Sequence, residues 1–161
     1  MNTKDYEKKV VECLNAQQNE IILNCNIDHA EILIKQMFLN AAHTVNLLSN
    51  KLDANLYERN DIVDAIRRFL NREGTTLNIA IEGNMDQGSI QLIGLLENHD
   101  INPVRIPDWL KEQYKYNFIT MDDTGYRFET DREKHEAVVN FGDTQQTEKL
   151  NNIFNTILNL A

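Results

Sequence analysis

The segment from Lys115 to Asp122 carries the side chains best suited to chemistry in this 161-residue chain. It reads Lys-Tyr-Asn-Phe-Ile-Thr-Met-Asp, so it offers an ammonium group, an amide and a carboxylate. A lysine with the ordinary pKa of about 10.4 is protonated at neutral pH, so Lys115 can hold an anion but is neither a nucleophile nor a base unless burial lowers that pKa.

A pair of glycines elsewhere has the spacing of a phosphate-binding loop. Gly83 and Gly88 follow a predicted strand and precede a predicted helix. The lysine that should follow the second glycine is absent, because Ser89 and Ile90 stand there, and without it the β and γ phosphates lose their main charge partner. We therefore interpret this stretch as a strand-to-helix loop rather than a nucleotide site.

Metal ligands and nucleophiles are scarce. Asp122 and Asp123 begin an Asp-Asp-Thr-Gly turn, which lacks the longer alternation of carboxylates that a calcium loop needs. His29 and His43 are separated by roughly 20 Å of predicted helix. His135 stands among glutamates and is interpreted as a surface histidine rather than a general base. The sequence predicts no metal and no cofactor.

The elements that must position these residues alternate first and then change pattern. Helices are predicted over 3–18, 27–42, 61–72 and 89–98 and from 143 onward, with one helical turn at 107–113 and a loop at 49–57. Strands are predicted over 20–25, 44–48, 75–81, 101–106, 115–121, 126–129 and 135–141. Alternating strands and helices, then adjacent strands, then a closing helix predict an α/β fold with a mixed sheet sandwiched by helices. Residues 1–20 are predicted to form a helix packing on a domain that spans 21–161.

Several residues have the pattern of helix caps. Asp28 is expected to cap the helix over 27–42, and Asn60 the helix over 61–72. Gly74 is expected to adopt the left-handed conformation beyond the latter helix, and Asp143 to cap the last helix. Pro103 interrupts the strand over 101–106, which predicts an edge position in the sheet.

Composition narrows the classes of partner. The net charge is −9 and the pI about 4.9, which makes nucleic acid unlikely as a general ligand because a polyanion needs a neutralising basic surface. Arg67, Arg68 and Arg72 are interpreted as a solvated helix surface. There is no apolar run long enough to cross a membrane and no secretory signal, so we expect a cytoplasmic protein with reduced Cys13 and Cys25.

The chain from about residue 21 to the C-terminus resembles one repeat of the phospholipase D-like phosphodiesterases. Their catalytic motif is His-x-Lys-x-x-x-x-Asp, in which Asp122 matches, Lys115 takes the histidine position and Asn117 takes the lysine position. The strand Tyr126-Arg-Phe-Glu129 is similar to one in degenerate members of that superfamily. The resemblance therefore implies a remnant or anion-binding site that comprises Lys115, Asn117, Asp122, Arg127 and Glu129. The strand at 136–141 and the helix over 150–157 follow in the same order.

In catalytic members, the resemblance implies, one histidine attacks phosphorus, a second protonates the leaving oxygen and the lysines hold the phosphoryl oxygens. A full site needs two copies of the motif, so a single repeat would pair with itself. The substitutions at 115 and 117 favour a non-catalytic interaction or regulatory module, bacterial or from a phage, which forms a homodimer and contacts a protein partner. The alternative is a phosphodiesterase or nuclease with an unconventional active site around Lys115, using His135 or Glu129.

Overall fold

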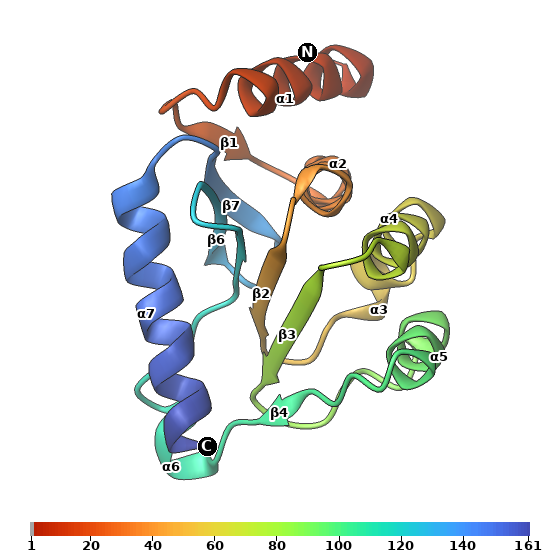
Figure 1. The fold of residues 1–161 in the computed structure, drawn as a ribbon, viewed down its shortest axis with the longest axis vertical. Coiled ribbons are helices and arrows are strands. Elements are labelled where there is room, and N and C mark those ends of the chain that lie inside the picture. The colour runs from red at the N-terminus through yellow and green to blue at the C-terminus, as the bar shows by residue number, and fades with distance from the viewer. Residues whose placement is uncertain (1) are drawn as a thin grey trace.

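A seven-stranded mixed sheet divides the molecule into three layers (Figure 1). The computed structural model describes residues 2–161. The strands are β1 Ile22–Asn24, β2 Thr44–Ser49, β3 Thr76–Ile81, β4 Val104–Arg105, β5 Phe118–Met121, β6 Gly125–Asp131 and β7 Glu136–Asn140. The helices are α1 Thr3–Ala16, α2 Ile27–Asn40, α3 Ala54–Tyr57, α4 Asn60–Asn71, α5 Ile90–Asn98, α6 Asp108–Lys111 and α7 Thr144–Leu160.

The order of strands across the sheet is β1-β7-β6-β5-β2-β3-β4. β2, β3 and β4 are parallel, whereas β5, β6, β7 and β1 join them in antiparallel pairs. The predicted α/β fold with a mixed sheet is confirmed. β2, β3 and β4 follow one another through helices and are parallel, whereas β5, β6 and β7 are joined by turns and are antiparallel. β4 lies at an edge of the sheet, as Pro103 predicts.

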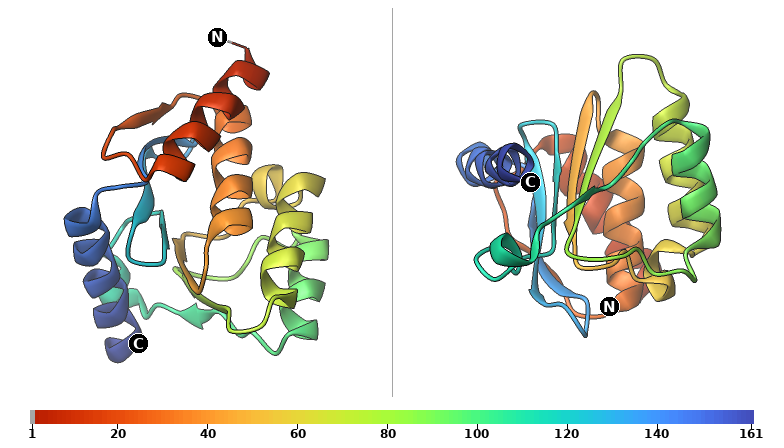
Figure 2. Two further views of the ribbon diagram at one scale, coloured as in Figure 1. Left: turned by 45° about the horizontal axis from the view of Figure 1, so that its top comes forward. Right: turned by 90° about the horizontal axis from the view of Figure 1, so that it is seen from below.

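The helices cover both faces of the sheet (Figure 2). α2, α4 and α5 pack on one face, where α4 buries Ile62, Ala65, Ile66 and Phe69 at helical spacing. α7 covers the other face and buries Leu150, Phe154 and Ile157 against Phe118 and Tyr126. Each of the isoleucine, leucine and phenylalanine side chains, once buried, stabilises the fold by about 1.5–3 kcal/mol. α1 contacts α2 and buries Tyr6, Val10 and Leu14.

Three local predictions need correction. Asn26, rather than Asp28, caps α2: its Oδ1 accepts a hydrogen bond from the amide of His29 at 2.9 Å. α4 already includes Asn60, which therefore lies inside the helix and makes no cap. The expected loop over 49–57 contains the short helix α3. α2 begins at Ile27 as predicted, so only its cap differs, whereas α4 begins one residue earlier than predicted.

Arg72 is exposed, as predicted, but its guanidinium also has a structural contact that the sequence does not indicate. It donates to the carbonyls of Phe38 and Ala41 and so satisfies the C-terminal end of α2. Gly74 does have the expected left-handed backbone, with φ +77°, and Asp143 accepts from the amide of Gln146 as predicted. No helix among residues 2–161 is both long enough and apolar enough to span a bilayer.

Candidate functional site

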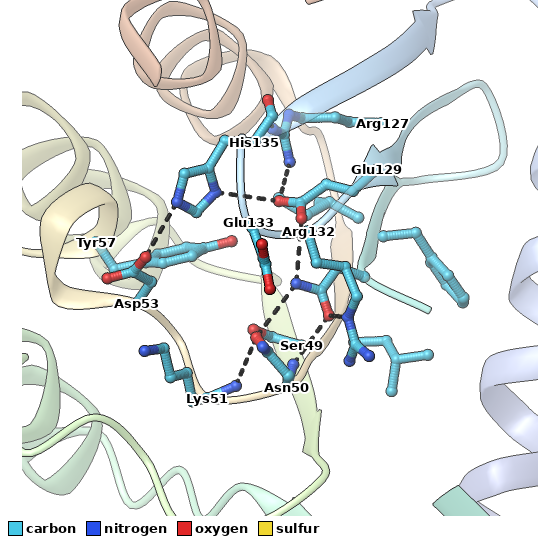
Figure 3. A pocket seen from close by; sticks show the side chains of 14 residues that line it. Ser49, Asn50, Lys51, Asp53, Tyr57, Arg127, Glu129, Arg132, Glu133 and His135 are labelled. Atoms are coloured by element: carbon cyan, nitrogen blue, oxygen red, sulfur yellow. Dashed lines mark hydrogen bonds and ion pairs between the residues drawn. The ribbon is translucent and has the colours of Figure 1, made fainter. Parts of the chain in front are cut away.

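A cavity of about 400 Å³ opens where β2 ends (Figure 3). Ligands of open α/β sheets bind in this region, outside the carboxyl ends of parallel strands. Polar and charged side chains dominate its wall, and Leu48, Phe118 and Ile119 supply an apolar part. The other lining residues are Ser49, Asn50, Lys51, Asp53, Tyr57, Asn117, Arg127, Glu129, Arg132, Glu133 and His135.

Arg127 is the most deeply buried charge of this cavity, with 1% of its surface exposed. It lies on β6 and projects to the same side as Glu129, two residues along the strand. Its Nη1 donates to Glu129 Oε1 at 3.0 Å, its Nε to Asn24 Oδ1 at 3.0 Å, and its Nη2 to the carbonyl of His135 at 3.2 Å. All three nitrogens of the guanidinium are thus used within the protein.

Glu129 is buried beside this guanidinium. Burial alone would raise the pKa of its carboxyl group, but His135 and Arg127 outweigh burial and lower that pKa below its usual value. Its second oxygen accepts from Asn117 Nδ2 at 3.2 Å. Glu129 is therefore a carboxylate whose charge is neutralised inside the wall of the cavity.

The side-chain amide of Asn117 makes all the hydrogen bonds that it can. Its Oδ1 accepts from the amide of Asn50 at 2.9 Å and from Arg132 Nε at 3.0 Å. Its Nδ2 donates to Glu129 Oε2 and to Asn50 Oδ1 at 3.3 Å. An asparagine side chain has two donor hydrogens and two acceptor lone pairs, so Asn117 has no capacity left for a ligand.

His135 is a buried residue, 7% exposed, so the predicted surface histidine is wrong. Asp131 Oδ1 accepts from the amides of Glu133 and Lys134 and so closes a turn, after which His135 takes the left-handed conformation with φ +55°. This turn directs the imidazole back into the cavity, as Figure 3 shows.

Both nitrogens of this imidazole face carboxylates. Nδ1 lies 3.6 Å from Glu129 Oε1, an ion-pair contact too long for a hydrogen bond, and Nε2 lies 3.0 Å from Asp53 Oδ2. Glu129 first, and then Asp53, raise the pKa of His135 above its ordinary value against the opposing effect of burial. Asp53 also caps α3 through the amide of Asn55, so the pair joins α3 to the turn before β7.

Several polar groups in the outer wall of the cavity have fewer hydrogen-bond or ion-pair partners. Arg132 Nη2 pairs with Glu82 at 2.5 Å. Tyr57 is buried, which raises the pKa of its hydroxyl, and this hydroxyl has no hydrogen-bond partner among residues 2–161. The side chains of Lys51 and Glu133 likewise have no ion-pair partner in the described chain, although both line the cavity.

The structure brings three of the five predicted site residues together: Asn117, Arg127 and Glu129. Lys115 lies outside the cavity wall, exposed, with its ammonium 2.8 Å from Glu112. Asp122 lies beyond the other end of β5, where its carboxylate accepts from three consecutive amides, those of Ala42, His43 and Thr44. Asp122 therefore holds the start of β2 and does not face the cavity.

Two important residues of the site were missed, Asp53 and Arg132, and His135 was named only for the alternative enzyme and was expected at the surface. Asp53 lies 82 positions before His135 in the sequence, so no local spacing relates them. The cluster of charges in Asp131-Arg-Glu-Lys-His135 is the only signal, and a charged turn has the same appearance. Among residues 2–161 no group of three or more His, Cys, Asp or Glu side chains is arranged to hold a metal ion.

The sequence profile of one family, described as "Domain of unknown function (DUF7931)", matches residues 26–159. No curated protein matches this sequence. A structure search finds a phospholipase D family member, Nuc from Salmonella typhimurium, with TM-score 0.64 and 16% identity, covering 87% of this chain and 95% of that one. It also finds TrmBL2, described as an archaeal chromatin protein with a novel mode of DNA binding, with TM-score 0.53 and 15% identity. That match covers 98% of this chain and 60% of the other.

Proposed function

This chain belongs to the DUF7931 family and has a phospholipase D-like fold, and from the geometry of its cavity we propose that it is a non-catalytic binding and regulatory module. The observation that carries the proposal is the state of the buried polar groups. The polar atoms of three side chains are hydrogen-bonded to one another and to neighbouring residues, so they are not directed at a ligand: Arg127, Glu129 and Asn117. A site prepared for phosphoryl transfer keeps donors directed at the reacting group instead.

The missing nucleophile supports the same conclusion. Lys115, at the histidine position of the motif, lies outside the cavity. His135 lies within it, but its Nε2 is 3.0 Å from Asp53 Oδ2 and its Nδ1 faces Glu129, so neither nitrogen is directed at a ligand. These contacts count against the alternative, an unconventional phosphodiesterase that uses Lys115 or His135.

A metal-free phosphodiesterase assay tests this proposal. We expect bis(4-nitrophenyl) phosphate and single-stranded DNA to be cleaved no faster than in buffer alone, with chelator present or absent. Turnover that survives chelation and disappears in either Lys115→Ala or His135→Asn would overturn the proposal. A variant at an unrelated exposed residue, Arg67→Ala, controls for contaminating nuclease, because a contaminant would leave the same activity in all preparations.

The homodimer belongs to the same proposal. A single repeat of a fold that builds its site from two motifs is expected to associate with a second copy, and either the dimer or a protein partner would supply the regulatory output. Light scattering after size exclusion, at tens of micromolar protein, measures the mass directly. A species near twice 18.7 kDa is expected, and a monomer at that concentration would remove self-association from the proposal.

A further inference from the structure

Resting on the proposed binding function, we infer that the cavity at the end of β2 takes a small zwitterion: an α-amino acid with an apolar side chain. The cavity volume, about 400 Å³, lies within the range of small-molecule sites. The inference depends on which groups of the wall are already paired and which are not.

The inner charges of the wall are compensated. Arg127 pairs with Glu129, His135 with Asp53, and Arg132 with Glu82. Buried charges in such pairs are costly to pull apart, so a ligand is not expected to separate them. Binding of a strong anion such as phosphate would require excess positive charge in the wall. The three ion pairs are neutral and provide no such excess.

Two lining charges remain, and they have opposite signs. Lys51, directly after β2, and Glu133, in the turn before β7, have no ion-pair partner among residues 2–161. Figure 3 draws both at the cavity, on different segments of its wall. A ligand with one carboxylate and one ammonium group satisfies both, whereas a singly charged ligand leaves one of them unpaired.

The remaining polar groups favour the same ligand. The Tyr57 hydroxyl has no partner within the described chain, and Arg132 uses Nε and Nη2 but leaves Nη1 without one. Both are donors suited to a carboxylate. Leu48, Phe118 and Ile119 form the apolar part of the wall, against which the ligand's side chain can pack.

Calorimetric titration of the full chain with L-leucine and L-phenylalanine at pH 7 tests the inference. We expect at least one to bind. We also expect the one-charge analogues of leucine, 3-methylbutylamine and 4-methylpentanoate, to bind about tenfold more weakly or not at all, because each loses a charge-assisted hydrogen bond. Inorganic phosphate should not compete.

Matched variants locate the site. Lys51→Ala and Glu133→Gln should each weaken binding of the amino acid about tenfold. Lys115→Ala and Glu136→Gln, which remove the same charges outside the cavity wall, should leave binding unchanged. All four change side chains with solvent access, and an unchanged unfolding midpoint checks their folding.

Three results would overturn the inference: neither amino acid binds the wild-type chain, the one-charge analogues bind equally well, or the cavity variants behave like their controls. Each is distinguishable from failure of the proposed function, since that failure appears as phosphodiester turnover. Phosphodiester turnover without amino-acid binding would contradict both the non-catalytic function and the amino-acid site. Binding of leucine without turnover would support both.

Discussion

The pairing of Arg127 with Glu129 is the residue-scale feature on which the cavity depends. Both side chains are almost fully buried, with 1% and 5% exposed, and they lie on one strand two positions apart. A buried guanidinium without its carboxylate would have to be solvated by whatever polar atoms remain, and such a group is costly to leave unpaired.

Removing either partner should therefore destabilise the protein strongly. Arg127→Met is expected to reduce the free energy of unfolding by about 3–5 kcal/mol, because the buried Glu129 loses its closest charge partner. Urea denaturation followed by circular dichroism measures this change. The double variant Arg127→Met with Glu129→Leu should recover part of the loss, since no charge then remains unpaired. Arg67→Ala, in an exposed pair with Asp64, should stay within about 0.5 kcal/mol of wild type.

His135 predicts a pH dependence whose sign follows from its neighbours. Because Glu129 and Asp53 raise its pKa in the folded state, the protonated form contributes stability that is fully present below the unfolded value of about 6.5. That contribution is lost as pH rises through the raised, folded pKa. The stability advantage of wild type over His135→Asn should therefore be larger near pH 6 than near pH 9.

Asparagine is the comparison of choice because it tolerates the left-handed backbone at this position and does not titrate. Denaturation curves at a series of pH values measure the difference, and an NMR titration of the imidazole reports the pKa of the folded protein. A midpoint at or below about 6.5, or an advantage that grows as pH rises, would contradict the ion-pair arrangement seen around His135.

At the scale of elements, the turn after β5 attaches two strands to each other. Asp122 adopts the left-handed conformation, φ +51°, and its carboxylate accepts from three amides at the start of β2. The sequence resemblance predicts Asp122 as a residue of a remnant phosphodiesterase site. In the structure its carboxylate instead holds the start of β2 and does not face the cavity.

Asp122→Ala should cost about 2–3 kcal/mol, because three amides lose a charged acceptor and alanine is strained at positive φ. The adjacent Asp123→Ala is the matched control: Asp123 is exposed and accepts none of these bonds, so its loss should change stability by less than about 0.5 kcal/mol. Chemical denaturation of both variants decides the matter, and equal effects would exclude the proposed strand-holding role.

The junction between β7 and α7 leaves no space for a side chain. A Cβ at Gly142 would lie 2.2 Å from the carbonyl oxygen of Gln17 and 2.6 Å from the amide nitrogen of Asn19, which belong to the connection between α1 and β1. That backbone cannot yield as a flexible side chain would. The N-terminal helix is thus tied to the domain by backbone proximity as well as by its apolar stripe.

Gly142→Ala is therefore expected to destabilise the protein by at least about 1–3 kcal/mol, the usual cost of overpacking. Gly94→Ala should have the opposite sign. Gly94 lies inside α5 with nothing within 4 Å of its missing Cβ, and alanine there should stabilise by about 0.5–1 kcal/mol. Thermal unfolding of the two variants compares them directly, and a neutral Gly142→Ala would mean that the connection between α1 and β1 moves freely.

For the whole molecule, the net charge decides which partners are plausible. TrmBL2 has a similar fold and is described as a DNA-binding protein, but this chain has a formal charge of −9. A polyanion gains affinity mainly by releasing counterions from contacts with lysine and arginine. A shared fold does not by itself provide a surface of lysine and arginine side chains.

We therefore expect no general affinity for DNA. In fluorescence anisotropy with labelled single- and double-stranded oligonucleotides at about 150 mM salt, binding should be weaker than the 10⁻⁴ to 10⁻⁶ M typical of non-specific DNA-binding proteins. Binding within that range, with a steep loss of affinity as salt increases, would show a basic track that the overall charge conceals.

The sequence by itself determined the layers of the molecule and part of its site. Helical and strand periodicity are local properties of a sequence. They therefore predict the apolar stripes of α4 and α7, and also the change from alternating elements to adjacent strands. Arg127 and Glu129 were found through the resemblance of their strand to one in degenerate phospholipase D-like proteins, and strand alternation explains why both point to one side.

Only the tertiary structure decided which polar groups meet. Asp53 and His135 converge across 82 positions, Asn117 turns out to be fully hydrogen-bonded, and Lys115 lies outside the cavity although it precedes Asn117 by two residues. These outcomes depend on the turn before β7, on the start of β5 at Phe118 and on the burial of each charge. Periodicity reports which side of an element a residue takes, whereas pairing and burial depend on segments that only the folded chain brings together.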